Sequence, residues 1–459
     1  MNKKFVFSLV VLLFCIYPNG KFFAQNDTIR VMTYNVLHYG DGCQGSNSFL
    51  HSNLKTIVQF ANPDILGMVK MQSIKLNVSD VNGISPPGFA DSIIRYALDA
   101  AFPGRYSYCT LTNVSRSPDD DMDVLFYDQR KLGFVSVVNL CAIQEDFDLY
   151  KLYYKDPNLI TTHDSTFLYF ILNHTISGSS SSGRDQQDSI VVKGLKKIFY
   201  HLPNLVTMGD FNTRTSAEPG YELLTTTSDS SFLFYDPPFN LDHELSYPIN
   251  WNSNSHCFPF LNVATRQSSS LPNACGQNGG AKDWYIHILL SPWIANNSDY
   301  VKYIPHSYTT LGNDGKRYDV SVNDSTTSGK NTSASPSVLN ALFQLSDKYP
   351  ILVKLGVTYN STGGGPVNPV NSIQEAQTQQ EPIKISNPVG DHITIHFPSD
   401  MLGKKVVMTW YDLTGRMLNT EELIIQSSDL DQPVYLLPGM YLLRLQSGEY
   451  SITSRVIKE

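Results

Sequence analysis

Short apolar runs alternate with longer amphipathic stretches over most of this chain. Runs rich in β-branched and aromatic residues, bounded by Gly, Pro, Asn or Asp, are typical of strands. They occur at residues 29–36, 124–127, 134–140, 166–172, 205–208, 285–290 and 351–357. Apolar residues at helical spacing predict helices at residues 50–61, 89–101, 188–200 and 336–345. The strands are too heterogeneous for a doubly wound parallel sheet, so we expect two packed sheets flanked by helices.

The N-terminal residues differ from this large domain, which we place at residues 25–357. Lys3 and Lys4 precede an apolar run that is too short to span a bilayer comfortably. Together with a cleavage point after Ala24, this arrangement predicts that residues 1–24 are a signal peptide. No later stretch is apolar enough to span a membrane, so we expect an exported, soluble protein.

Two regions of different composition and hydrophobic pattern follow the large domain. Residues 358–382 are rich in Gly and Pro and then in Gln, and they show no hydrophobic period, which is typical of a linker. Residues 383–459 return to short alternating strands separated by turn residues. This spacing predicts a small all-β sandwich.

Composition excludes some classes of function. The formal charge of the chain is −8, and removal of the predicted leader takes away three lysines and makes the remaining chain more acidic. Non-specific nucleic-acid binding is therefore not expected. Five cysteines remain outside the leader without a Cys-x-x-Cys spacing, which argues against a zinc site. In an oxidising compartment one or two disulfides are expected, and Cys257–Cys275 is the favoured pair because these residues bracket one loop-rich region.

Candidate chemistry centres on Gly209-Asp-Phe-Asn212, which follows a predicted buried strand. Asp210 and Asn212 are two residues apart, so on an extended chain their side chains point the same way. A carboxylate and an amide at a strand end can hold a water, a phosphate oxygen or a hard cation. An Asx turn that merely closes the strand is the alternative.

Further segments accompany this one in a set order. They are Met32-Thr-Tyr-Asn-Val36, Pro63-Asp-Ile-Leu-Gly-Met68, Phe170-Ile-Leu-Asn-His174 and Ser346-Asp-Lys-Tyr-Pro350. The ordered set resembles the endonuclease/exonuclease/phosphatase family, which has the DNase I-like fold. The resemblance implies a four-layered α/β sandwich and Mg²⁺-dependent phosphoester hydrolysis.

Carried over by position, the resemblance implies a role for each retained residue. Asn35 would contact the metal or a phosphate, and His174 would hydrogen-bond a phosphate oxygen. Asp210 would orient the attacking water with Asn212 beside it, and Asp347 would be the last acidic partner.

Three departures from the family pattern bear on activity. Lys70 stands where the resemblance implies a metal-binding Glu, Lys348 where it implies a catalytic His, and Ile286 where it implies an Asp. An ammonium in place of a carboxylate changes the local charge by two and repels a dication. We therefore expect that the protein binds no cofactor. If it is active, the expected cofactor is Mg²⁺. Our hypothesis is that the two lysines neutralise Asp210 and Asp347.

Other readings of these residues stay open. Lys70 could extend towards solvent while Asp41 or Asp123 supplies a metal ligand, giving an active phosphodiesterase or nuclease with rearranged ligands. The acidic run at residues 119–123 could bind Ca²⁺, although such runs are more often solvated loops. His287, next to Ile286, points to the other sheet face and is expected to be an ordinary strand histidine.

The tail resembles the C-terminal sorting domain of the type IX secretion system of Bacteroidetes. The matching segments are Ile385-Ser-Asn-Pro-Val389, Tyr411-Asp-Leu-Thr-Gly-Arg416, Leu437-Pro-Gly-Met-Tyr441 and Ser454-Arg-Val-Ile-Lys458. The resemblance implies the secretion machinery as a partner and a location at the cell surface or outside the cell. We expect a secreted protein with lost or strongly impaired hydrolysis that binds a phosphate-bearing or nucleic-acid ligand, another anion or a protein partner.

Overall fold

The computed structural model describes residues 26–40, 45–72, 89–110, 121–143, 145–162, 165–251, 254–266, 277–359, 383–412, 417–447 and 450–458. The chain divides into two compact units, residues 1–367 and 368–459. The predicted signal peptide, Asp41 and most of the predicted linker lie outside the described residues. Among the helices that are described, none is long and apolar enough to cross a membrane.

The first sheet has seven strands with a parallel pair near its centre. Its strands run in the order β12 (Val301–Tyr303), β14 (Ile351–Thr358), β1 (Asn26–Tyr39), β2 (Ile65–Gln72), β4 (Asp121–Asp128) and β3 (Tyr106–Tyr108), and β13 (Thr309–Thr310) pairs with β14. β1 and β2 are parallel, whereas β14 and β4 flank them antiparallel. Parallel neighbours need a crossover, and α2 (Asn47–Ala61) lies in this one.

The second sheet repeats this plan with five strands. Its order is β11 (Ile286–Leu290), β8 (Leu205–Asp210), β7 (Phe167–His174), β6 (Glu145–Tyr154) and β5 (Leu132–Ile143). β7 and β8 are parallel, and α6 (Ser182–Ile198) lies in their crossover. In each sheet the two parallel strands therefore end at the same edge, and the residues that follow them gather there.

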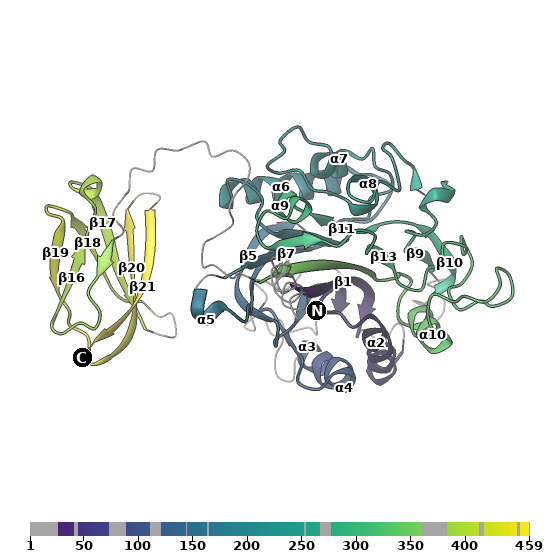
Figure 1. The fold of residues 1–459 in the computed structure, drawn as a ribbon, viewed down its shortest axis with the longest axis horizontal. Helices are drawn as coiled ribbons and strands as arrows, with labels where there is room; N and C mark the ends of the chain where they lie inside the picture. Colours follow the sequence, from purple (N-terminus) through teal and green to yellow (C-terminus); the bar gives the residue numbers. More distant parts are fainter. Residues whose placement is uncertain are drawn as a thin grey trace, which may run out of the picture. The chain divides into compact units, whose positions relative to one another are not determined.

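Helices cover the outer face of each sheet, while the two sheets face each other (Figure 1). On the first sheet lie α2, α3 (Phe89–Ile93), the π-helix η1 (Ile94–Leu98), α4 (Asp99–Ala101) and α10 (Pro336–Leu345). On the second lie α6, α7 (Pro219–Thr225), α8 (Pro237–Asn240) and α9 (Pro292–Asn296). Shorter elements are α5 (Leu159–Thr162), η3 (Ser255–Cys257), β9 (Val263–Arg266) and β10 (Gln277–Asp283). The predicted four-layered α/β sandwich is confirmed.

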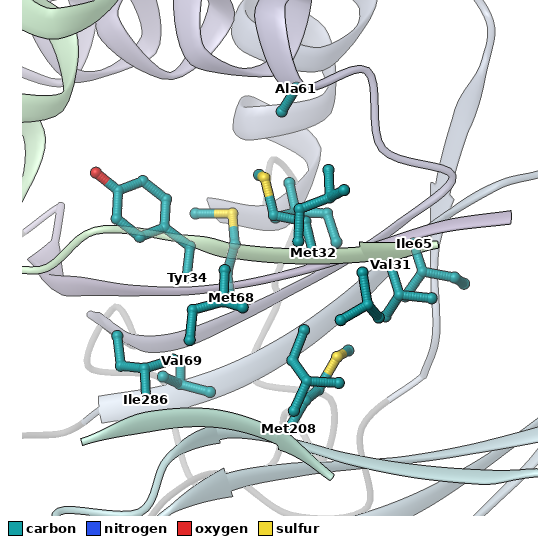
Figure 2. Close-up of a cluster of buried hydrophobic side chains, with 14 of the residues drawn as sticks. Val31, Met32, Tyr34, Ala61, Ile65, Met68, Val69, Met208 and Ile286 are labelled. Carbon is teal, nitrogen blue, oxygen red and sulfur yellow. The ribbon is translucent and has the colours of Figure 1, made fainter. Parts of the chain in front are cut away.

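The core occupies both faces of the first sheet. Figure 2 shows Met32 and Tyr34 on the side of the strands where Ala61 of α2 lies, with Met208 and Ile286 on the opposite side. This follows from the two-residue period of a strand, which gives each face its own set of apolar side chains. Ser46 caps α2 by accepting the backbone N–H of Phe49.

The predicted elements are all observed, although one helix begins earlier than expected and several observed elements, among them β6, were not predicted. α6 begins at Ser182 rather than at residue 188, because its first turns are polar and carry no apolar period. The strand β6 was not predicted, and it pairs with β5 along most of its length. The favoured disulfide is wrong for Cys257, which is a buried free thiol, and Cys275 lies outside the described residues.

The C-terminal unit forms two small antiparallel sheets. One has β15 (Lys384–Ile385), β16 (His392–His396) and β19 (Asp429–Pro433), and the other has β17 (Lys405–Tyr411), β18 (Met417–Ile424), β20 (Gly439–Ser447) and β21 (Tyr450–Lys458). A 3-10 turn, η4 (Ser399–Met401), lies between β16 and β17. Trp410, Ile393 and Leu443 lie in a separate hydrophobic core. The predicted all-β tail is confirmed.

Candidate functional site

The end of β8 brings Asp210 beside the end of β7. In the parallel β7–β8 pair, Asp210 lies opposite His174. Gly209, one residue earlier, has a φ of 142°, and a Cβ at this position would lie 1.9 Å from the backbone oxygen of Asn173. Only glycine fits so close to a neighbouring backbone. The strand order thus joins two predicted site residues from different strands.

The Asp210 carboxylate accepts hydrogen bonds from two neutral donors. Asn35 Nδ2 donates to Oδ2 at 2.8 Å, and the backbone N–H of Asn212 donates to Oδ1 at 3.0 Å. Asn212 Nδ2 in turn donates to the Thr175 carbonyl at 2.7 Å. Asp210 is 1% exposed. Asn35 from β1 and Asp210 from β8 therefore connect the two sheets at this edge.

Lys70 lies at a bulge shared by β1 and β2. The register between these strands shifts after Asn35, and Leu37, His38 and Lys70 all have left-handed backbones, with φ values of 47°, 57° and 63°. The Lys70 N–H donates to the Asp123 carboxylate at 3.0 Å. Left-handed conformations are costly for side chains of this size, and bulges re-aim side chains near functional sites.

The segment after α10 completes the site. Ser346 Oγ donates to the Asn35 carbonyl at 2.8 Å, which holds this segment against the end of β1. Lys348 Nζ lies 3.1 and 3.2 Å from the two oxygens of Asp347. Both residues are buried, with relative exposures of 8% for Lys348 and 1% for Asp347. The ion pair expected between these two residues is therefore present.

The second expected ion pair is not formed. Within the described part of the chain, no lysine or arginine pairs with Asp210, so the hypothesis that Lys70 neutralises it is wrong. The geometric reason is the bulge at Lys70, which breaks the strand alternation on which that expectation depended. Asp210 relies instead on the neutral donors described above. We refer to Asn35, Lys70, His174, Asp210, Asn212, Asp347 and Lys348 together as the strand-end site.

The two residues of β11 next to this site are structural. Ile286 lies opposite Asp210 in the β8–β11 pair and is fully buried in the core. His287 points to the other face, where its Nδ1 lies 2.9 Å from Asp236 and both side chains are fully buried. Asp236 also accepts the Tyr221 hydroxyl at 2.6 Å. His287 is thus part of the packing under α7 and α8.

Sequence reasoning missed a second group of polar residues at this edge, namely Asp283, Tyr285 and Arg214. Burial raises the pKa of Asp283, and a hydrogen bond from Tyr285 and the charges of Arg214 and Lys348 counteract this rise. Burial also raises the pKa of Tyr285 to about 12, and the Asp283 and Asp210 carboxylates act in the same direction. Asp283 and Tyr285 are two residues apart at the start of the predicted strand 285–290, and this spacing of polar side chains at a strand terminus is a signal that could have found them.

The residues present do not fit a Mg²⁺ site. Mg²⁺ demands octahedral oxygen coordination with one or two carboxylates available to it. Asp347 is engaged by an ammonium, and both Asp210 oxygens already accept hydrogen bonds. Among the described residues, metal-ligating side chains gather within 4.8 Å of one another at Asp242, Glu244 and His306, and no such group forms around Asp210.

Residues 386–459 match the family model described as the secretion system C-terminal sorting domain, which confirms the sorting tail identified from the sequence. No curated protein matches the chain.

Solved structures similar to the chain include the human Nocturnin catalytic domain with bound sulfate, at 14% identity and a TM-score of 0.42, covering 72% of this chain and 97% of that one. An endonuclease/exonuclease/phosphatase family protein of Bacteroides thetaiotaomicron is 13% identical with a TM-score of 0.41, covering 74% and 100%. A mannosyl-6-phosphatase of the same organism is 13% identical with a TM-score of 0.40, covering 71% and 99%. Sequence identities and TM-scores this low carry no information about the chemistry of the strand-end site.

Proposed function

We propose that this chain is an exported protein whose strand-end site binds a phosphate-bearing anion and has lost, or strongly impaired, metal-dependent phosphoester hydrolysis. The observation that carries the proposal is the contact of Lys348 Nζ with both oxygens of Asp347. A carboxylate held in this way is not available to orient a histidine or to bind a metal. The ligand classes that fit are phosphate esters and short nucleic-acid segments.

Electrostatics favour an anion over a dication at this place. A pair of unit charges 4 Å apart interacts by about 4 kcal/mol near a protein surface, and a divalent ion would feel repulsion of that order from each nearby ammonium. Lys348 and Arg214 are both close enough to act on Asp283. His174 at the end of β7 and Asn212 beyond β8 supply hydrogen-bonding groups at the same edge. Asp210 opposes the anion and limits its affinity.

The tail supports export. Its match to the secretion system sorting domain implies contact with the secretion machinery and a location at the cell surface or beyond it. We propose the type IX system as that machinery, after export by a signal peptide at residues 1–24. The tail would serve only to direct secretion. The large unit alone would bind the ligand.

A titration of the full chain with p-nitrophenyl phosphate tests the proposed binding. Replacement of Asp210 by Asn should tighten binding about threefold to tenfold, because it removes a negative charge next to the anion. Replacement of Arg214, whose side chain is exposed, by Gln should weaken binding by a similar factor. Lys302→Gln, an exposed lysine on β12, is the control and should change nothing. An affinity that stays unchanged in both Asp210→Asn and Arg214→Gln would contradict the proposal.

A second function is favoured by one observation. The Asp123 carboxylate lies at the backbone N–H of Lys70, next to the position where the family resemblance implies a metal-binding Glu. If Asp123 supplies that ligand, the protein is an active metal-dependent phosphodiesterase or nuclease. Metal-dependent turnover abolished by both Asp123→Asn and Asp210→Asn would establish this function in place of the first.

A further inference from the structure

A second polar site lies at the other end of the first sheet. A pocket of about 660 Å³ opens there between the start of β1, the end of α2 and the middle of β14. Five cationic side chains line it: Arg30, Arg105, Arg130, Lys131 and Lys354. A volume of this size is in the range of small-molecule sites.

Three of the five cations are matched by carboxylates. Lys131 Nζ lies 3.0 Å from Asp27. Arg105 bridges Asp64 at 2.8 Å and Asp128 at 2.7 Å. Arg130 also pairs with Asp128, at 2.8 Å. The three acids and these three cations balance one another in charge.

The other two cations of the pocket, Arg30 and Lys354, take part in none of these ion pairs. They lie directly opposite each other in the antiparallel β1–β14 pair. Like charges at such positions destabilise a sheet, because their side chains share one face. Among the described residues no acid pairs with either side chain, and Arg30 Nε is buried without a hydrogen-bond partner. A buried donor without a partner is costly unless a ligand or water satisfies it.

We propose that this pocket binds a doubly charged tetrahedral oxyanion, a phosphate or sulfate group, between Arg30 and Lys354. Two unmatched positive charges call for a dianion, and its oxygens can accept from the Arg30 guanidinium and the Lys354 ammonium together. Arginine suits this role because its planar fork binds phosphate oxygens in pairs. The matched ion pairs of Lys131 and Arg105 hold the wall of the pocket in place.

This pocket is separate from the strand-end site. Arg30 and Asn35 lie on the same strand, five residues apart, which corresponds to about 17 Å along β1. The two anion sites are therefore expected to bind independently, and substitutions in one should leave the other unchanged.

Calorimetric titration of the full chain with inorganic phosphate, at ionic strength matched with chloride, tests the proposal. Arg30→Gln and Lys354→Gln should each weaken the binding at least tenfold, and Lys354→Arg should retain it. Arg214→Gln, next to the strand-end site, and Lys197→Gln, an exposed lysine on α6, are the controls and should leave this binding as it is. Binding that survives Arg30→Gln and Lys354→Gln together, or that is lost in Arg214→Gln, would overturn the proposal.

Two further measurements separate the ligand sources and guard against misfolded variants. Glucose 6-phosphate that binds more tightly than inorganic phosphate identifies an ester as the ligand, and the reverse order identifies the free ion. Acetate that binds as tightly as either would contradict the requirement for a dianion. In phosphate-free buffer, Lys354→Gln should raise the melting temperature, because it removes a like-charge contact, whereas a lower melting temperature would show that Lys354 serves only the fold.

Discussion

At the two ends of β1 the charged side chains are matched in opposite ways. At the strand-end site, Asp347 has a lysine as its own neighbour in sequence, and Asp210 is held by two neutral donors. In the pocket at the other end, the three acids pair with three other cations, and Arg30 and Lys354 lie opposite each other without an acid partner among the residues that the structure describes. The backbones differ too, because the left-handed residues Leu37, His38 and Lys70 occur only at the strand-end side of this strand pair.

The two sites therefore differ in the feature that would allow each of them to bind an anion. The strand-end site has a strained backbone, and in it Lys348 compensates Asp347 while Asp210 is held by neutral donors. The pocket has an ordinary sheet backbone with uncompensated charge, which is what a simple binding site needs. Substitutions that disturb the backbone should therefore affect the first site, and substitutions that change charge should dominate at the second.

The largest effect is expected from Gly209→Ala. The added Cβ would lie 1.9 Å from the Asn173 backbone oxygen, at a φ of 142° that favours glycine, so β7 and β8 could not keep their register. We expect a loss of about 3 kcal/mol or more in the free energy of unfolding, measured by urea denaturation. Gly403→Ala, in an open turn of the other unit with φ of 78°, is the control for backbone strain without a clash. Equal losses in both would show that the close approach at Gly209 is unimportant.

The double variant Lys70→Glu with Lys348→His should create metal binding. It supplies the two residue types that the family resemblance implies and releases Asp347 from its ammonium. We expect the affinity for Mg²⁺, measured by calorimetry, to rise at least about a hundredfold over the parent chain, in line with the change in local charge. Lys70→Gln with Lys348→Gln removes the same charges without adding ligands and should gain much less. No gain in the first variant would count against the placement of these lysines in the strand-end site.

A smaller, pH-dependent effect is expected at Asp188, a buried acid on α6. Burial raises its pKa to about 8, nearby Asp185 adds to the rise, and Arg184 opposes it while pairing with Glu218. The folded state therefore binds a proton that the unfolded state releases near pH 4, and stability falls as the pH rises from about 4 to about 8.

Asp188→Asn should abolish this slope. Because the amide remains a buried polar group, we expect a net gain of about 1–2 kcal/mol at pH 8 and little change at pH 4. Urea denaturation at both pH values measures it. Asp185→Asn removes only the neighbouring charge and should reduce the slope without abolishing it. A constant difference between parent and Asp188→Asn across this range would contradict the assignment.

Much of this fold could be predicted from the sequence, since strand-period and helix-period runs mark nearly every core element. Asn35, His174 and Asp210 could be grouped because each stands at the end of a predicted strand. The bulge at Lys70 could not be predicted, because left-handed φ at a lysine leaves no local sequence signal, and this is why the expected Lys70–Asp210 pair failed. Arg30 and Lys354 meet only through the β1–β14 register, which depends on long-range pairing.

The central claim is that Lys348, by holding Asp347, has replaced metal-dependent chemistry at the strand-end site. Hydrolysis of bis(p-nitrophenyl) phosphate by the full chain in Mg²⁺, Mn²⁺ and Ca²⁺ tests it most directly, with the Asp210→Ala variant measured beside the parent. The account predicts that parent and variant show the same rate, no higher than that of buffer with the metal alone. Metal-dependent turnover in the parent that Asp210→Ala abolishes would contradict it.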